Sequence, residues 1–176
     1  GEETREMARL DAVELITTPT GEKVIDFKQE VTGYVEWVVP ARKGNTYKLQ
    51  HAEFLDKDGN FYTENLRSAK CEIEVTSNGV EQVYKPHFSF QGFRYIKLIG
   101  FNDDEIKLEN FTAIVVFSDM KRTGFFACGH EDIQQLYENI VWGQRGNFLD
   151  VPTDCPQRDE RLGWTGDAQV FARTAS

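Results

Sequence analysis

Residues 88–117 read FSFQGFRYIKLIGFNDDEIKLENFTAIVVF, and this stretch decides the fold class. Two short apolar runs, 93–100 and 111–117, lie on either side of a polar connection. Short apolar runs rich in aromatic and β-branched residues, bounded by turn signals, are typical of strands that are buried on both faces. The stretch therefore predicts two core strands of a sheet.

The residues before this stretch continue the pattern of short strands. Further strand-like runs cover residues 31–39, 47–55, 71–76 and 81–84. An Asp-Gly turn within 56–60 and an Asn-Gly turn at 78–79 are signals for hairpins. Several short strands with regular turns favour an antiparallel β-sandwich, which we assign to residues 22–122. Residues 1–21 are polar, and we expect them to be an N-terminal lead-in ahead of the strands.

The pattern becomes helical after a linker at residues 119–124. Apolar residues then fall on one face of a helix, at positions 133, 136, 137, 140 and 141. This helix is expected to end near residues 143–146, and Thr165 can cap a second helix. Two helices and a long loop cannot close a core. Residues 123–176 therefore predict the start of a larger, truncated helical domain. Its uncovered apolar faces favour self-association, or disorder of residues 126–176.

Composition narrows the classes of partner. The 176 residues carry 29 acidic and 20 basic side chains, a net charge of −9, which argues against nucleic acid or an anionic membrane as the main partner. There is no apolar run of membrane-spanning length, and the N-terminus lacks a signal-peptide core, so bacterial cytoplasm and cell envelope both stay open. Three widely spaced cysteines and three scattered histidines predict no metal site.

The loop at residues 153–169 reads TDCPQRDERLGWTGDAQ and carries the chemistry. Carboxylates and arginines can bind sugar hydroxyls in pairs, and the Trp164 indole can cover an apolar sugar face. A carboxyl group in a crowded, apolar pocket can stay protonated and act as a general acid. A structural ion-pair network is the alternative, in which Asp167 is a helix-start charge and Trp164 a core anchor. Cys155 fits a small buried hydrophobe rather than a nucleophile.

Residues 150–172, DVPTDCPQRDERLGWTGDAQVFA, closely resemble the signature of glycoside hydrolase family 78, the bacterial α-L-rhamnosidases. The stretches GEKVIDFKQEVTGYVEW (21–37), LQHAEFLDKDGNFYTENLRSAK (49–70) and FSFQGFRYIKLIG (88–100) resemble the domain that precedes the catalytic barrel in this family. One departure is DFKQE (26–30), where we expect DFGQN in the family. Lys28 and Glu30 are therefore expected to change a local turn or a domain contact.

The resemblance implies a fold and a reaction. The fold is mainly β: an antiparallel β-sandwich followed by the first helices of an (α/α)6 barrel. The reaction is hydrolysis of terminal, non-reducing α-L-rhamnose from a glycoside or polysaccharide, with inversion and without a metal or organic cofactor. The family's general base lies further along the barrel than Ser176, so residues 1–176 alone are expected to be inactive.

The resemblance also assigns roles within the matched motif. Glu160 resembles the general acid. The residues that resemble the rhamnose-binding set are Asp154, Arg158, Trp164 and Asp167. Asp159 and Arg161 match the motif and are expected to pair with neighbours and orient Glu160.

A carbohydrate-binding module is the second hypothesis for the β-sandwich. It would bind sugars through exposed aromatic residues, with Trp37, Tyr62, Phe88, Phe90 and Tyr95 as candidates. Aromatic residues in strands are more often core, because they bury a large area there. His51 and Glu53 can be a ligand pair or a polar contact at a domain interface. A third hypothesis gives the sandwich a structural role, as a support for the barrel, and this is the one we favour.

Overall fold

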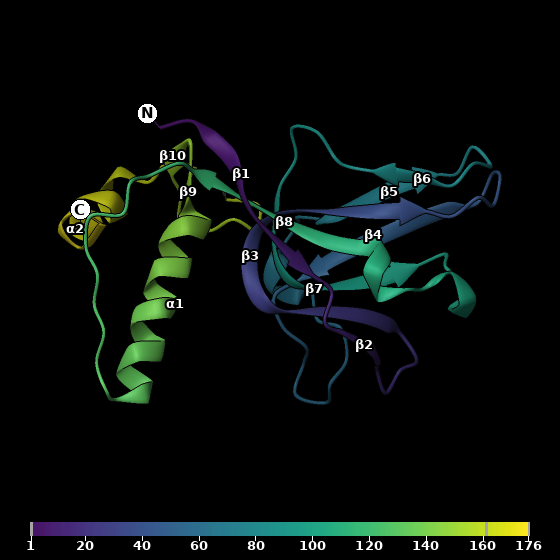
Figure 1. The fold of residues 1–176 in the computed structure, drawn as a ribbon, viewed down its shortest axis with the longest axis horizontal. Coiled ribbons are helices and arrows are strands. Elements are labelled where there is room, and N and C mark those ends of the chain that lie inside the picture. Colours follow the sequence, from purple (N-terminus) through teal and green to yellow (C-terminus); the bar gives the residue numbers. More distant parts are fainter. Residues whose placement is uncertain (1, 161, 176) are drawn as a thin grey trace.

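The computed structural model describes residues 2–160 and 162–175 (Figure 1). Its large sheet consists of β1 (Thr4–Asp11), β2 (Glu14–Thr17), β3 (Lys23–Val39), β4 (Thr46–Ala52), β5 (Glu72–Thr76), β6 (Gln82–Tyr84), β7 (Gln91–Ile99) and β8 (Phe111–Ser118). Short 3-10 helices lie between strands: η1 (Glu64–Leu66), η2 (Asp103–Glu105) and η3 (Leu108–Asn110). After the sheet come α1 (Glu131–Asn147), β9 (Phe148–Leu149), β10 (Val151–Pro152) and α2 (Thr165–Ala175). We call residues 4–118 the sheet domain.

The sheet is antiparallel and curls around the long strand β3. The strand order is β1-β8-β3-β7-β4-β5, with β2 and β6 each paired to β3 off this path. The pairing of β3 with β7 is interrupted between Asp26 and Val31, which lets the strand bend. Gly33 pairs with Gln91 on β7 and with Val115 on β8, and a Cβ atom there would lie 1.8 Å from the Ile114 carbonyl oxygen, so only glycine fits. The predicted fold class, antiparallel β followed by helices, is confirmed.

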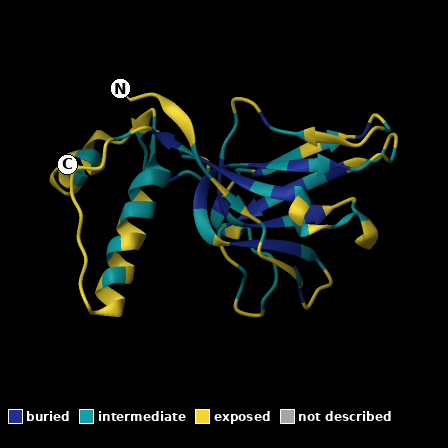
Figure 2. Cartoon of the chain, in the orientation of Figure 1, coloured by how far each residue is buried: buried dark blue, intermediate teal, exposed yellow. Residues whose placement is uncertain are grey.

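The core lies inside the curled sheet, as the buried strands in Figure 2 show. Trp37 is 1% exposed and stacks parallel to Phe111, with ring centroids 6.4 Å apart. Tyr47 meets the Trp37 ring edge-on at 6.2 Å. Strands β7 and β8 are buried along most of their length, as the two apolar runs predicted. The aromatic richness of the sequence therefore serves this core.

Residues 4–17 form two strands, which the sequence reasoning missed. It expected a polar lead-in, whereas β1 pairs with β8 and β2 pairs with β3. Both strands are mostly exposed, so they need few apolar residues. Their backbone hydrogen bonds to β8 and β3 give them a place in the sheet that hydrophobic periodicity does not report.

One of the two predicted hairpin turns is confirmed and the other is wrong. In the first turn the Asp56 N–H donates to the Asn60 carbonyl oxygen at 2.8 Å, and Leu55 pairs with Phe61. The turn at 78–79 does not make a hairpin, because β5 pairs with β4 while β6 pairs with β3. The end of β5 is held by the turn after β3, where the Ser77 N–H donates to the Asn45 carbonyl oxygen at 2.9 Å.

The helices lie to one side of the sheet domain (Figure 1). Helix α1 ends at Asn147, one residue beyond the predicted end, and its apolar face includes Ile133 and Leu136, which are 47% and 58% exposed. Thr165 is the first residue of α2 rather than its cap. Neither of the two described helices is long and apolar enough to span a membrane.

Candidate active site

The candidate site is a closed loop between the two helices. Pairing between Thr153 and Gly163 joins the two ends of this loop, and the Thr153 N–H donates to the Asn147 carbonyl oxygen at the end of α1, at 2.8 Å. We call residues 153–163 the acid loop; Arg161, which the sequence placed next to Glu160, lies outside the described residues. Closure brings side chains that are several residues apart in sequence to one place.

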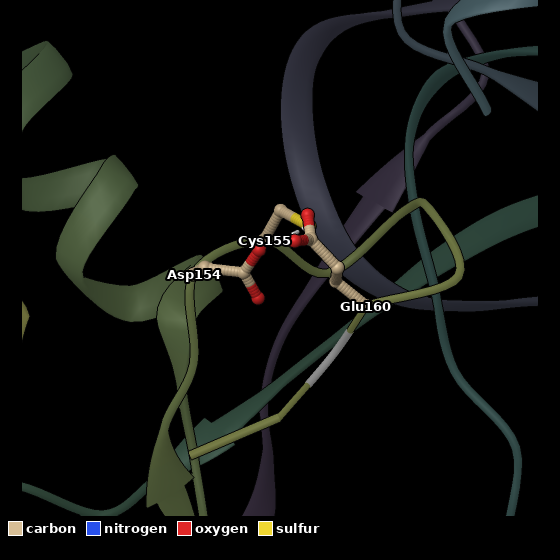
Figure 3. Close-up of side chains that lie close together, drawn as sticks. All are labelled: Asp154, Cys155 and Glu160. Atoms are coloured by element: carbon tan, nitrogen blue, oxygen red, sulfur yellow. Dashed lines mark hydrogen bonds between the residues drawn. The ribbon is translucent and has the colours of Figure 1, made fainter. Parts of the chain in front are cut away.

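Three of the predicted residues meet in this loop. Arg158 donates from Nε and Nη2 to Glu160 Oε2 at 2.7 Å, and from Nη2 to Asp154 Oδ2 at 3.1 Å. Figure 3 shows the side chains of Asp154, Cys155 and Glu160 pointing toward one another. Asp154 is the most buried of the charged three, at 15% side-chain exposure, against 31% for Arg158 and 30% for Glu160. One guanidinium therefore joins the two carboxyl groups.

The surroundings of Asp154 favour its ionised form. Burial raises the pKa of Asp154. Hydrogen bonds with the Cys155 thiol, the Arg158 guanidinium and the Glu160 carboxyl lower it by more than burial raises it, so the net pKa lies below its usual value. An ionised Asp154 therefore lies beside the Glu160 carboxyl, with the Arg158 guanidinium between them.

The same cluster offers ligand atoms to a metal, but its own cation already joins the carboxylates. One ligand atom each of Asp154, Cys155 and Glu160 lies within 4.8 Å of the others. The Arg158 guanidinium contacts both carboxyl groups at hydrogen-bond distance, and such charge-assisted bonds are among the strong ones in proteins. We therefore interpret the cluster as a guanidinium-bridged carboxyl pair.

The structure places the other two predicted residues at the start of α2. Trp164 directly precedes the helix and is 43% exposed, and its carbonyl oxygen accepts from the Ala168 N–H at 3.1 Å. Asp167 is exposed in the first turn, where the helix dipole favours a negative charge. The exposed indole is not a core anchor in the described structure.

Residues of the sheet domain contact the acid loop and support it. The Cys71 thiol donates to the Gln157 carbonyl oxygen at 2.8 Å, and Ser68 binds Asp159 through its backbone N–H at 3.3 Å and through its hydroxyl group. Gly92 on β7 packs directly under Pro156 and Gln157. Sequence reasoning missed these supporting contacts, because the residues lie 64 to 91 positions from their partners. The one available signal was that residues 49–70 and 88–100 resemble the domain that precedes the catalytic barrel in the family.

A cavity of about 360 Å³ opens between the sheet domain, α1 and the acid loop. Its polar lining includes Glu30, Glu53, Asn147, Asp154 and Gln157. Asp154 Oδ1 is buried in the described structure without a hydrogen-bond partner, so it is free to accept one. Burial and the charge of Glu53 raise the pKa of Glu30 to about 9, which keeps this carboxyl neutral near pH 7. Glu30, the departure from the family pattern, therefore lies at the contact between the domains.

The aromatic candidates for a separate sugar site differ in how far the fold exposes them. Trp37 and Tyr95 are buried in the sheet domain at 1% and 9% exposure, so neither offers a face to a ligand. Tyr62 stacks on Phe54 with ring centroids 5.3 Å apart. Phe88 is fully exposed, whereas Phe90 is partly buried.

His51 and Glu53 do not form a ligand pair. His51 is fully buried, its Nδ1 lies 2.9 Å from the Cys71 carbonyl oxygen, and its ring meets Phe93 edge-on. Glu53 is half-buried at the domain contact, where Asn65 donates to it at 2.6 Å and Gln157 also bonds to it. The expected polar contact between the domains thus holds for Glu53 alone.

Comparison with known proteins independently supports the family resemblance of the sequence. The model of the bacterial alpha-L-rhamnosidase concanavalin-like domain matches residues 16–117, and that of the bacterial alpha-L-rhamnosidase 6 hairpin glycosidase domain matches residues 121–176. An alpha-L-rhamnosidase of Formosa agariphila is 46% identical over 156 residues, which cover 86% of this chain and 17% of that protein.

Solved structures agree with the sequence matches. The native α-L-rhamnosidase of Aspergillus terreus superposes with a TM-score of 0.94 at 43% identity, over 99% of this chain and 20% of that one. The Streptomyces avermitilis enzyme, solved as a complex with L-rhamnose, gives a TM-score of 0.93 at 42% identity, over 99% of this chain and 17% of that one. The chain thus spans a fifth or less of the length of these relatives.

These matches place a bacterial alpha-L-rhamnosidase concanavalin-like domain before residues that match a 6 hairpin glycosidase domain. The chain belongs to the bacterial α-L-rhamnosidase family.

Proposed function

We propose that the complete protein containing residues 1–176 hydrolyses terminal α-L-rhamnose from glycosides or polysaccharides with inversion, and that Glu160 is its general acid. The observation that carries the proposal is the Glu160 carboxyl itself, which lies beside an ionised Asp154 on an arginine-bridged loop of the family motif.

The chemistry follows from the charges of this cluster. A protonated Glu160 transfers its proton to the glycosidic oxygen as the bond between that oxygen and the anomeric carbon breaks, while water attacks the opposite face of the sugar. Inverting enzymes place the second carboxylate, which activates this water, about 6.5–9.5 Å from the acid. Asp154 Oδ1, which is buried without a described partner, supplies an acceptor for a sugar hydroxyl.

The other candidate residues have supporting roles in this proposal. Arg158 holds Asp154 and Glu160 together, the exposed Trp164 covers the sugar's apolar face, and Asp167 accepts from a further hydroxyl. Residues 22–122 support the site, and residues 123–176 begin the catalytic domain.

Replacing Glu160 by Gln tests the acid assignment in the complete protein. Loss of general acid catalysis costs about 10²–10⁴-fold in rate, so kcat for an alkyl or sugar α-L-rhamnoside should fall by that factor. Glu109→Gln, an exposed glutamate far along the sheet domain, is the matched control and should keep the wild-type rate. An unchanged rate in Glu160→Gln would overturn the assignment.

Two further measurements separate the parts of the proposal. Proton NMR of the first-formed sugar should show β-L-rhamnose from an α-L-rhamnoside, and the α anomer would exclude inversion. Residues 1–176 alone should give no turnover, since the expected base is supplied later in the barrel. Turnover by this segment with Glu160 intact would contradict that placement of the base.

A further inference from the structure

A loop of the sheet domain reaches the candidate acid. Arg67, the residue after η1, places Nη1 3.2 Å from Glu160 Oε2 and 4.0 Å from Asp159 Oδ1. The next residue, Ser68, binds Asp159 Oδ2 through its N–H at 3.3 Å and through its hydroxyl. Two consecutive residues of one domain thus hold two consecutive residues of the acid loop, across more than ninety positions of sequence.

The backbone at Arg67 is strained in a way that serves this contact. Its φ of 59° and ψ of −118° lie in a region that side-chain-bearing residues rarely adopt. The conformation is held by Leu66, which is 1% exposed, and by the Ala69 N–H, which donates to the Leu66 carbonyl oxygen at 3.1 Å. Strain of this kind persists where surrounding structure fixes it, and it is concentrated at functional sites.

The charge balance shows what Arg67 adds. Arg158 is shared between Asp154 and Glu160, and Asp154 is ionised at neutral pH, so much of the Arg158 charge is already matched. Arg67 brings a second guanidinium to the same Glu160 oxygen. When Glu160 gives up its proton, the new carboxylate finds this cation in place.

We propose that Arg67 is a positioning residue for the general acid, supplied by the sheet domain: it fixes the Glu160 carboxyl and stabilises the carboxylate formed as the leaving group takes the proton. The inference rests on the proposed function of Glu160. It gives the sheet domain a share in the chemistry as well as in the support of the barrel.

The test uses the complete protein with Arg67→Met and Arg67→Gly. Glycine accepts a positive φ, so Arg67→Gly removes the guanidinium without adding backbone strain and should fold as well as the wild type. Lys70→Met, which removes an exposed cation from the same loop, is the matched control. Each variant is assayed with 4-nitrophenyl α-L-rhamnoside, whose leaving group needs little protonation, and with methyl α-L-rhamnoside, whose leaving group needs it fully.

Two results are expected from both Arg67 variants. The loss in kcat should be about tenfold greater for the methyl than for the nitrophenyl substrate, because only the former depends on the acid. The alkaline limb of kcat/KM should move to higher pH, since removal of a neighbouring cation disfavours the ionised carboxylate. Lys70→Met should show neither change.

Equal losses on both substrates with an unmoved alkaline limb would reduce Arg67 to a structural residue and overturn the inference, as would wild-type behaviour. Glu160→Gln, assayed in parallel, separates the two levels. If that variant loses the methyl substrate while the Arg67 variants do not, the inference fails alone. If it keeps full activity, the proposed function fails with it.

Discussion

Gly92→Ala tests whether the sheet domain sets the position of the acid loop. A Cβ atom on Gly92 would lie 2.8 Å from Pro156 Cγ, 2.9 Å from Gln157 Cβ and 3.2 Å from the Gln157 backbone nitrogen. Carbon atoms in ordinary contact are about 3.5–4.0 Å apart, so one side must retreat by about 1 Å. Neither a proline ring nor a backbone nitrogen can rotate away as the end of a flexible side chain can. Strand β7 is paired on both sides, with β3 and with β4, so we expect the acid loop to be the part that moves.

The magnitude follows from that displacement. A misplacement of about 1 Å can cost on the order of 10²-fold in rate, so kcat/KM for 4-nitrophenyl α-L-rhamnoside should fall by about that factor in the complete protein. The accompanying overpacking should cost about 1–3 kcal/mol in the free energy of unfolding, measured by urea denaturation. The φ of Gly92 is not in the left-handed region, so the methyl group acts by contact alone.

The control for this prediction is Gly129→Ala, because a Cβ atom there meets no described atom within 4 Å. It should leave kcat/KM unchanged. If Gly92→Ala retains kcat/KM within twofold of the wild type, the acid loop is not positioned by β7 and the reasoning is refuted.

Two predictions concern the stability of residues 1–176. The raised pKa of Glu30, about 9 against an ordinary 4.5, means that the folded chain keeps a proton that the unfolded chain releases; stability is therefore fully present below about pH 4.5 and declines as the pH rises toward 9. Glu30→Gln imitates the neutral form and should remove this decline. The urea midpoint of the variant should therefore exceed that of the wild type at pH 8 but not at pH 4.5. Equal midpoints at both pH values would contradict the burial argument. Trp37→Ala should lower the free energy of unfolding by about 3–5 kcal/mol in the same urea assay, because the indole is 1% exposed at the centre of the core, and a loss below about 1 kcal/mol would be incompatible with that packing.

The parts of the fold that sequence predicted are those in which side chains alone determine the structure. The runs at 93–100 and 111–117 became β7 and β8 because apolar residues on both faces have to be buried. Strand β1 was missed because an exposed edge strand is held by backbone hydrogen bonds to β8, which every sequence can make. The pairing of β6 with β3 was missed because the Asn-Gly signal reports a turn but not the strand on which the chain next lies.

The candidate site likewise contains residues that the sequence predicted and residues that it did not. Asp154, Arg158 and Glu160 lie within seven residues of one another, so their sequence proximity and the family motif were enough to bring them together. Arg67 carries no local signal: its role depends on a contact with Glu160 that only the folded chain creates. His51 was misjudged because a strand pattern places it on a face but does not say how deeply that face is buried.

The support of the acid loop has a consequence for how such proteins can be recombined. Glu160 follows the linker at 119–124, whereas Arg67, Ser68 and Gly92 precede it. A chimera joined at that linker would take the candidate general acid from one parent and the residues that contact the acid loop from the other. Productive exchanges between relatives should therefore carry both segments as one block, with junctions that fall outside it.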